Sequence, residues 1–255
     1  LVCQVKVKQD VRLVIPEAYL KVQRFRTEVT EIEDLTHDIK RIVLKLLEPD
    51  TIDCKPGQYI QFEVPGTSEF RAYSMSSPPS WQHALEIIVR LVPGGLCTGY
   101  IFNRLKVGDT IYVTGPYGDF YLREDSPRDI LCVAGGSGVA PIKSIITHLF
   151  EQGTTRQVLY FFGARAVKDL YFYRECLELA SRYPNFTYVP ALSAMDPEDQ
   201  WDGETGFIHT VIDRHVGSCQ NMEAYLCGPP VMIDAVIEVL KRKGMPESLI
   251  YFDKF

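Results

Sequence analysis

The sequence has no long apolar run and no excess of basic residues. No stretch reaches the roughly 18 uncharged apolar residues that a membrane-spanning helix requires. No segment has the basic start, apolar middle and small-residue cleavage site of a signal peptide. The 27 basic residues are outnumbered by 33 acidic residues, and the net charge of −6 argues against a nucleic-acid binder. We therefore expect no membrane span in this chain and no nucleic-acid partner.

Cysteine is scarce and unpaired. The chain has seven cysteines, which are scattered singly and odd in number. This usage favours reduced thiols and a cytoplasmic location over a disulfide framework. The five histidines have no partner at metal-ligand spacing, so no metal site is expected. The acidic residues Glu31, Glu33 and Asp34 are interpreted as a solvated turn, not as a pair of catalytic carboxylates.

The chain is long enough for one large domain or two modest ones, because 46% of its 255 residues are apolar. Up to about residue 124 apolar and polar side chains mostly alternate, as Leu85, Ile87 and Val89 do with Glu86 and Arg90. This period of two is typical of half-buried antiparallel strands. Because proline and glycine turns separate the short strands, this half is predicted to form a small barrel.

The pattern changes after Ser126-Pro127, where near-continuous apolar runs alternate with helical stretches. Strands that are buried on both faces lose their polar alternation, and strand–helix alternation indicates a parallel sheet. The predicted strands are 130–134, 158–162, 186–192, 224–226 and 249–252, and the predicted helices are 141–151, 170–181 and 231–243. The domain boundary is expected at about residues 122–129.

The first 22 residues fit neither pattern. Residues 3–8 alternate like a strand, and residues 15–17 resemble a linker. A chain that begins in the middle of a strand suggests that an upstream segment is missing.

Arg71, Ala72, Tyr73 and Ser74 form the first motif with chemical potential. Arginine offers a planar fork to a phosphate, and tyrosine offers a flat face and a hydroxyl to a planar ligand. Serine can donate a hydrogen bond to a ring nitrogen. The alternative is an ordinary barrel strand with a surface arginine, which these four residues alone do not exclude.

A second motif runs from Pro93-Gly94-Gly95 into a predicted helix that begins near Leu96, Cys97 and Thr98. Glycines before a helix N-terminus leave free backbone N–H groups and a positive dipole end for a phosphate. The alternative is a glycine-rich hairpin turn in which Thr98 caps the helix.

The third motif is a strand, a glycine-rich turn and a helix, at Gly135, Gly136, Gly138 and Pro141. This order lets backbone approach a pyrophosphate with no intervening side chain. It lacks both the G-x-G-x-x-G spacing and the lysine of a P-loop. A tight turn without a ligand is the alternative, although the flanking strand and helix favour the binding turn.

Two further motifs lie near the C-terminus. Cys227-Gly228-Pro229-Pro230 separates a strand from a helix, where ligands bind in parallel sheets. Cys227 is either part of such a site or a buried structural thiol. The chain ends in Asp253, Lys254 and Phe255, and this terminal aromatic residue is either a frayed end or a lid on a flat ligand.

With these motifs in this order, the sequence resembles the ferredoxin–NADP reductase superfamily of flavoproteins from residue 23 to its end. Within that superfamily it is similar to the NADH-dependent reductase components of bacterial oxygenases and to the F subunit of Na⁺-translocating NADH:quinone reductase. The resemblance implies an antiparallel β-barrel flavin domain at residues 23–124, followed by an α/β Rossmann-like nucleotide domain with a parallel sheet at residues 125–255.

The resemblance also implies the cofactors FAD and NADH and the residues that hold them. The residues matched to the FAD site are Tyr59, Arg71, Ala72, Tyr73, Ser74, Leu96, Cys97 and Thr98. The residues matched to the NAD site are Gly135, Gly136, Gly138, Pro141, Gly163, Arg165, Asp169, Gly228 and Pro229. The matched catalytic residues are Ser74 beside the flavin, Cys227 beside the nicotinamide, the acidic residue Asp253, and Phe255 as a lid over the flavin ring.

The implied activity is hydride transfer from NADH to FAD, followed by single-electron transfer to an iron–sulfur centre. Residues 1–22 resemble the end of a ferredoxin domain with its linker, in which Cys3 would be one ligand of a 2Fe-2S cluster. That cluster is expected only in a longer protein, so the acceptor is either a missing ferredoxin domain or a separate protein. The alternatives are a regulatory subunit without turnover of free NADH and the NADH-oxidising subunit of a membrane quinone reductase.

Overall fold

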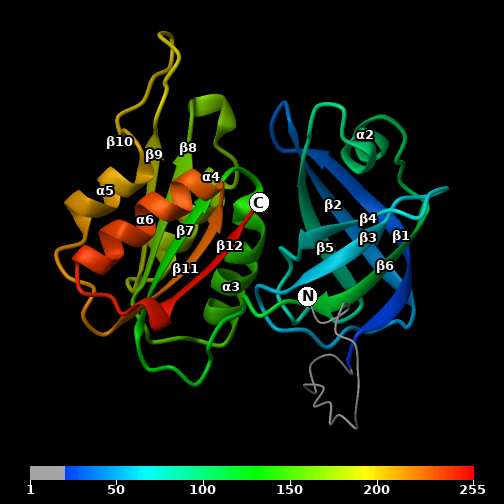
Figure 1. Cartoon of the computed structure of the whole chain (residues 1–255), viewed down its shortest axis with the longest axis horizontal. Coiled ribbons are helices and arrows are strands. Elements are labelled where there is room, and N and C mark those ends of the chain that lie inside the picture. The colour runs from blue at the N-terminus through cyan, green and yellow to red at the C-terminus, as the bar shows by residue number, and fades with distance from the viewer. Residues whose placement is uncertain (1–20) are drawn as a thin grey trace, which may run out of the picture.

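The computed structural model describes residues 21–255 and shows two units side by side (Figure 1). The expectations for Cys3 and for nearly all of segment 1–22 lie outside the described residues. No helix within residues 21–255 combines the length and the apolar character needed to cross a membrane.

The first unit is the expected antiparallel barrel, built from a six-stranded sheet in the order β4-β3-β6-β1-β2-β5. A bridge between Met75 and Ile87 and a hydrogen bond from Ser76 N to Glu86 O (2.8 Å) connect the two edge strands. The barrel strands are β1 (Gln23–Asp34), β2 (Ile39–Glu48), β3 (Tyr59–Glu63), β4 (Phe70–Ser74), β5 (Ala84–Arg90) and β6 (Thr110–Tyr117). Helix α2 (Leu96–Asn103) lies between β5 and β6 at one end of the barrel.

The interpretation of Glu31, Glu33 and Asp34 as a turn is wrong. All three lie in β1, where the β2 side chains Arg41 and Lys40 neutralise them at 2.5–3.2 Å. Because cross-strand pairs of opposite charge stabilise a sheet, these acidic residues suit a strand although they break the apolar pattern.

The second unit contains the expected parallel sheet, in the order β10-β9-β8-β7-β11-β12, with all neighbours parallel. Its strands are β7 (Asp129–Gly135), β8 (Val158–Ala164), β9 (Phe186–Leu192), β10 (Glu204–Thr205), β11 (Met222–Gly228) and β12 (Ile250–Lys254). Its helices are α3 (Val139–Glu151), α4 (Tyr173–Arg182), α5 (Ile208–His215) and α6 (Pro230–Arg242). The helix predicted near residues 170–181 begins at Tyr173, and α5 was not predicted.

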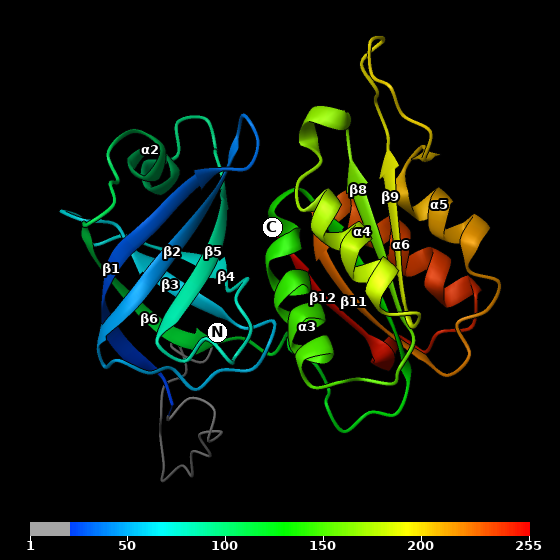
Figure 2. The ribbon, with the colours of Figure 1, turned by 180° about the vertical axis from the view of Figure 1, so that it is seen from behind.

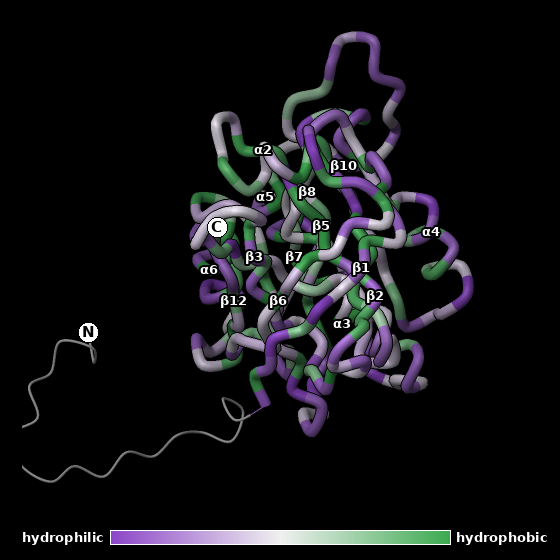
Figure 3. The backbone as a smooth tube through the Cα atoms, turned by 90° about the vertical axis from the view of Figure 1, so that its right-hand side faces the viewer, coloured by the Kyte–Doolittle hydropathy of each residue, from purple (hydrophilic) through white to green (hydrophobic). Residues whose placement is uncertain are grey.

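Helices cover both faces of this sheet, which explains the apolar runs of its strands. Helices α5 and α6 lie in front in Figure 1, and α3 and α4 lie in front in the reverse view of Figure 2. Along β7, Ile130 and Cys132 belong to the core on the α3 and α4 side, whereas Leu131 and Val133 belong to the core on the α5 and α6 side. In Figure 3 the inner strands β7 and β8 are mostly green, whereas the long β9–β10 connection is largely hydrophilic.

The outer face of β5 joins the two units. Leu85, Ile87 and Val89 point into the barrel core, so Glu86 and Arg90 lie on the other face, which contacts α3 and the turn before it. The alternation predicted a half-buried strand with Glu86 on its polar face. The side chain of Glu86 is instead only 1% exposed, because the second unit covers it.

Candidate flavin and nucleotide sites

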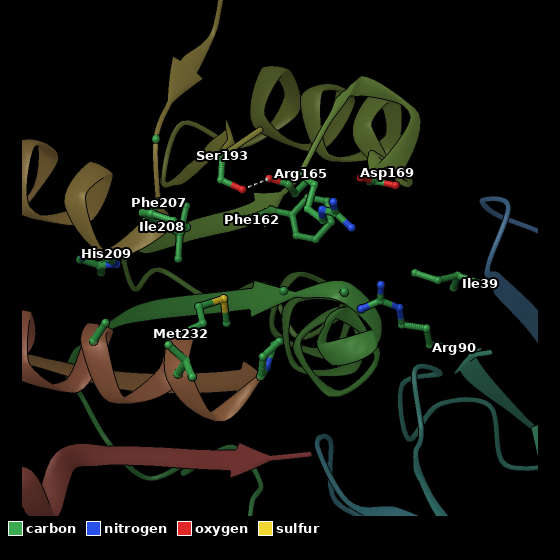
Figure 4. A pocket seen from close by; sticks show the side chains of 18 of the residues that line it. Ile39, Arg90, Phe162, Arg165, Asp169, Ser193, Phe207, Ile208, His209 and Met232 are labelled. Atoms are coloured by element: carbon green, nitrogen blue, oxygen red, sulfur yellow. Dashed lines mark hydrogen bonds between the residues drawn. The ribbon is translucent and has the colours of Figure 1, made fainter. Parts of the chain in front are cut away.

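A pocket of about 420 Å³ lies at the C-terminal edge of the parallel sheet. Six of the residues matched to the NAD site line it: Gly135, Gly136, Gly163, Arg165, Asp169 and Pro229. The barrel contributes His37, Asp38, Ile39 and Arg90 to the same pocket. In Figure 4, Ile39 and Arg90 approach from the barrel side, while Phe207, Ile208 and His209 lie at the far end. The pocket is therefore built by both units.

The glycine-rich turn after β7 requires glycine for two reasons. Gly136 has a φ of +55°, a left-handed conformation that glycine adopts readily. At Gly138 an added Cβ atom would lie 2.2 Å from the carbonyl oxygen of Cys227. Because that neighbour is backbone, it has no side-chain rotamer by which to move away. The turns after β7 and β11 thus meet at the edge of the pocket.

The turn leads into α3, which begins at Val139 and has no side chain that caps its N-terminus. The first N–H groups of a helix have no partner within the helix, and the helix dipole is positive at this end. Pro141 occupies the first turn, where its missing N–H group costs nothing. Tyr171 supports the turn, since its hydroxyl donates to Gly136 O at 2.6 Å. This arrangement suits a phosphate group.

Arg90 is a candidate binding residue that the sequence analysis did not select. Its Nη1 atom lies 3.4 Å from the position of a Cβ atom on Gly136, so the guanidinium group faces the glycine-rich turn. Its Nε donates to Asp38 Oδ2 at 2.8 Å. Burial opposes the ionisation of Asp38, but the hydrogen bonds from Arg90 and Thr36 hold the pKa of this carboxyl below its ordinary value. A basic residue at the end of a strand, next to a glycine-rich motif, was the available signal.

The rim of the pocket combines charged groups near the barrel with an aromatic surface at the far end. Arg165 is exposed, and Asp169 Oδ1 lies 3.9 Å from His37 Nδ1 across the domain boundary. Phe207 is 65% exposed, and its ring stacks with His209 at a centroid distance of 5.9 Å. An exposed phenylalanine at the rim of a pocket offers a face on which a flat base can stack.

The residues matched to the FAD site form a second group, on the barrel. Arg71 and Ala72 are exposed, and Tyr73 and Ser74 are half-buried. Arg71 Nη1 is held by Glu69 Oε2 at 2.9 Å and by Phe70 O at 2.6 Å. The hydroxyl of Tyr73 donates to Cys97 Sγ at 3.4 Å, which connects β4 to the start of α2. Burial and the contact with Cys97 raise the pKa of Tyr73, so its hydroxyl is protonated.

Hydrogen bonds between Thr98 and Val92 stabilise the start of α2. Thr98 Oγ1 bonds to both the N–H and the carbonyl of Val92, each at 3.2 Å, and does not cap the helix. A Cβ atom on Gly95 would lie 2.6 Å from that oxygen. Leu96 is 51% exposed, whereas Cys97 is buried. The helix therefore presents free N–H groups beside Tyr73, which fits the cradle expected for a pyrophosphate.

Tyr59 is half-buried on β3, on the face opposite Ile60 and Phe62 of the barrel core. Its ring stacks on Tyr117 at 5.6 Å, and a Cβ atom on Gly118 would lie 2.9 Å from it. Tyr59 pairs with Ser74 in the register of β3 and β4, so it lies directly beside the Arg71–Ser74 motif.

The C-terminal strand places three predicted residues around one turn. Cys227 and Asp253 are register partners on β11 and β12, and Phe255 N donates to Gly228 O at 3.4 Å. The Cys227 side chain is fully buried, and burial together with Asp253 raises the pKa of its thiol. Burial also raises the pKa of Asp253. Phe255 is 58% exposed, and the C-terminus lies between the two units (Figures 1 and 2).

The structure thus separates the predicted site into two groups. The pocket contains the nucleotide-turn residues, whereas residues 71–74 and 96–98 lie on the barrel and do not line it. Gly138, Pro141, Cys227 and Gly228 are buried in or next to these turns and are not among the residues that line the pocket. Six free cysteines lie in the described part of the chain.

This fold and these paired sites define a flavin- and nucleotide-binding oxidoreductase, and the chain belongs to the ferredoxin–NADP reductase superfamily. Residues 26–121 match the family model of the oxidoreductase FAD-binding domain, and residues 132–238 match that of the oxidoreductase NAD-binding domain. The resemblance inferred from the motifs is confirmed.

Individual relatives show which members of the superfamily the chain is similar to. The chain is 41% identical over 235 residues to the reductase component of phenol 2-monooxygenase from Pseudomonas sp. (strain CF600), a match that covers 92% of this chain and 66% of that protein. It is 32% identical to the F subunit of the Na⁺-translocating NADH-quinone reductase of Klebsiella pneumoniae, covering 100% of this chain and 73% of the relative. The crystal structure of the Amycolatopsis cytochrome P450 reductase GcoB aligns with a TM-score of 0.85 at 33% identity, covering 92% of this chain and 70% of that one. The chain therefore spans about two thirds of the length of the curated oxygenase reductases that it matches.

Proposed function

We propose that this chain oxidises NADH through bound FAD and passes the electrons singly to an iron–sulfur centre, as part of a reductase of the oxygenase type. The observation that carries the proposal is the contact of Gly138 with the Cys227 carbonyl, which brings two ligand-binding turns together opposite Arg90 of the flavin barrel. When bound, FAD accepts a hydride from NADH and releases the two electrons one at a time. The chain's own task is to bind, orient and shield the two reactants.

The barrel residues fit FAD. Arg71 offers its guanidinium to a phosphate, and Tyr73 offers a hydroxyl already oriented by Cys97. Leu96, Cys97 and Thr98 supply the free N–H groups at the start of α2, beside Tyr73. Ala72 belongs to the same strand as Tyr73, and Tyr59 is the register partner of Ser74 on β3. Ser74 lies at the end of β4, where its hydroxyl can donate to a flavin ring nitrogen.

The pocket fits a dinucleotide. The turn at Gly135, Gly136 and Gly138, with Pro141 behind it, offers backbone N–H groups to the pyrophosphate, and Arg90 faces it from the barrel. Gly163, Arg165 and Asp169 border the adenosine end. We favour NADH over NADPH because Asp169 lines this pocket together with Arg165 and repels a 2′-phosphate.

The nicotinamide end is assigned to the turn of Cys227, Gly228 and Pro229. Cys227 acts as a buried neutral wall, since its raised thiol pKa keeps it protonated. Burial raises the pKa of Asp253, which makes its carboxyl easier to protonate than an exposed one, and we assign it a role in proton exchange beside the flavin. Phe255 covers the flavin face and moves away when the nicotinamide enters, which its exposure and single weak backbone bond permit.

The domain assignment and the partner complete the proposal. The boundary at residues 124/125 falls between the end of β6 at Tyr117 and the start of β7 at Asp129. The acceptor is a 2Fe-2S centre. It belongs either to a ferredoxin domain, of which segment 1–22 would be the last part, or to a separate protein. The proposed location of the protein is the cytoplasm. A second candidate is the NADH-oxidising subunit of a membrane quinone reductase, which the match along the whole chain to a relative of that kind favours.

The visible spectrum tests the proposal. Protein supplied with FAD should be yellow, and NADH should bleach it without oxygen; ferricyanide should then restore the colour with repeated turnover. Bleaching without turnover would indicate the regulatory subunit, and a spectrum that NADH does not change would contradict both assignments. With the full-length protein, electron transfer to an oxygenase component rather than to a quinone would decide between the two enzymes.

A further inference from the structure

Strand β5 of the barrel contacts helix α3 and the turn before it through three successive side chains of its outer face. Arg90 faces the turn at Gly136, and Ile88 belongs to the same apolar cluster as Val139 and Ala140 at the start of α3. Glu86 Oε1 accepts a hydrogen bond from Lys143 Nζ at 2.6 Å, one turn further along α3. The outer face of β5 thus follows the helix from the phosphate turn into its second turn.

Glu86 is held by more than its partner on α3. Its Oε1 also accepts from Ser76 Oγ at 2.7 Å, and its Oε2 accepts from Arg41 Nε at 2.5 Å. Its backbone N–H donates to Ser77 Oγ at 3.1 Å. The Glu86 carboxylate, which is 1% exposed, is therefore held on the outer face of β5 by residues of the barrel unit, independently of its contact with α3.

Lys143 is fixed from the other unit. Its ammonium lies 5.2 Å from the ring centroid of Phe172, which precedes α4, and its side chain is 28% exposed. The next residue, Ser144, is buried and donates from its hydroxyl to Ser77 O at 2.7 Å. Two directional contacts between the units are thus adjacent on α3, in addition to the apolar packing.

These contacts lie outside both binding sites. Lys143 and Glu86 do not line the pocket, and neither belongs to the residues assigned to FAD. Separating the two members of a buried ion pair leaves uncompensated charges, so the energy of the protein rises when α3 moves away from β5. Because the same helix carries the phosphate turn at its N-terminus, a shift of α3 along the barrel moves that turn relative to the flavin.

We propose that Lys143 and Glu86 are positioning residues, which lock α3 onto β5 and thereby set the approach of the nicotinamide to the flavin. This inference rests on the proposed function, since it concerns the geometry of that same reaction. A misplacement of about 1 Å at a reacting centre can cost about 100-fold in rate. The lock therefore governs the hydride-transfer rate within the bound complex more than the affinity for NADH.

The test is anaerobic stopped-flow reduction of the FAD-loaded protein by NADH. We expect Lys143→Met to lower the limiting rate at saturating NADH by about 10- to 100-fold and to weaken the charge-transfer absorbance of the NADH–flavin complex. The half-saturating NADH concentration should rise by a smaller factor than the limiting rate falls, since Arg90 on β5 faces the same turn. Dithionite, which needs no nucleotide site, should reduce the flavin as in the wild type. Lys143→Arg should recover most of the rate, because it keeps the charge that Glu86 accepts.

Two controls complete the test. Glu86→Gln should lower the limiting rate similarly, and the double variant should lower it little further, as expected for two residues that act through one contact. Lys241→Met provides the matched control, because Lys241 lies 3.8 Å from Glu238 and from Glu247 on the surface of α6. Lys143→Gln, which keeps a donor, replaces Lys143→Met if the latter does not fold with FAD.

The outcomes separate the two proposals. A wild-type protein that NADH does not reduce contradicts the proposed function. A wild-type protein that is reduced, together with a folded Lys143→Met or Lys143→Gln variant reduced at the same limiting rate, contradicts the positioning role. A loss of thermal stability or NADH affinity with an unchanged limiting rate also contradicts it.

Discussion

Arg90 of the flavin barrel and Asp38 in the β1–β2 connection form an ion pair at 2.8 Å on the rim of the nucleotide pocket. The pair uses Nε of the guanidinium and leaves Nη1 directed at the glycine-rich turn. Arginine binds phosphate in a planar, bidentate manner, and orienting it in advance lowers the entropy lost on binding. The barrel therefore places a charged side chain opposite the glycine-rich turn, which has none of its own.

Replacing Arg90 should weaken NADH binding. A hydrogen bond to a charged group contributes about 1.5–3 kcal/mol, so Arg90→Ala should raise the KM for NADH by roughly 10-fold or more in steady-state assays with ferricyanide. Asp38→Asn should give a smaller rise, because the guanidinium remains but is less well oriented. Arg214→Ala is the control, since Arg214 pairs with Glu204 at 2.6 Å and does not line the pocket. An unchanged KM in Arg90→Ala would exclude the phosphate role.

Gly138→Ala should disrupt the junction of the two turns. Its Cβ atom would lie 2.2 Å from the Cys227 carbonyl oxygen, and overpacking of this kind costs about 1–3 kcal/mol. We expect a lower Tm and a weaker NADH affinity by equilibrium titration. Gly217→Ala is the matched control, because a Cβ atom there has no neighbour within 4 Å. Equal behaviour of the two variants would show that the turns do not depend on this contact.

The buried carboxylate of Glu86 should make stability depend on pH. Burial alone would raise the pKa of Glu86, but Lys143, Ser76 and Arg41 outweigh it and hold the pKa below its ordinary value of 4.5. A lowered pKa in the folded state contributes stability that is fully present above the unfolded pKa and lost as the pH falls through the folded pKa. At pH 7, Glu86→Gln should therefore lower the free energy of unfolding by about 3 kcal/mol, as for a broken buried pair.

Thermal unfolding at several pH values measures this effect. The difference in Tm between wild type and Glu86→Gln should be largest at neutral pH and should shrink below pH 4.5. Glu63→Gln is the control, since Glu63 pairs with the exposed Arg24 and ion pairs of this kind contribute little to stability. A difference in Tm that is the same at both ends of the pH range would show that Glu86 is not ionised in the folded protein.

Phe255→Ala should open the flavin face to the nicotinamide. The side chain is 58% exposed, and its backbone is held by one bond at 3.4 Å, so its removal should leave the Tm nearly unchanged. We expect the charge-transfer absorbance with NADH to increase and the KM for NADPH to fall relative to that for NADH, because competition for the flavin face is removed. Unchanged KM values for both nucleotides would refute the lid.

Much of the fold could be predicted from local patterns. The alternation of Leu85, Ile87 and Val89 with Glu86 and Arg90 predicted a barrel strand, and the structure has one at β5. The apolar runs around Ile130 and Val158 predicted strands that are buried on both faces. The structure confirms this, since helices cover each side of the sheet. The glycines at 135, 136 and 138 predicted a turn whose backbone can approach a pyrophosphate, and the structure has a turn there. It also gives Gly138 a reason that was not predicted, because the Cys227 carbonyl leaves no room for a Cβ atom.

Other features required contacts between distant segments. Helix α5 was not predicted, although its buried side chains Ile208, Val211 and Ile212 have the i, i+3, i+4 spacing of a helix. Its eight residues are fewer than the window over which that period is normally read. Arg90 was not selected because its target, Gly136, is 46 positions away in the chain and becomes its neighbour only when the domains pack.

Sequence by itself determined the local chemistry of this protein: the period of each strand, the glycine turns, and the motif order that indicated flavin and nucleotide domains. Only the tertiary structure decided whether the polar face of β5 is exposed to solvent or buried against another element. A polar residue in an alternating strand is normally directed to solvent, and only the docking of α3 turns Glu86 into a buried partner of Lys143. Strand period depends on neighbouring residues, whereas burial depends on which surface covers the strand, and that surface lies about fifty residues away along the chain.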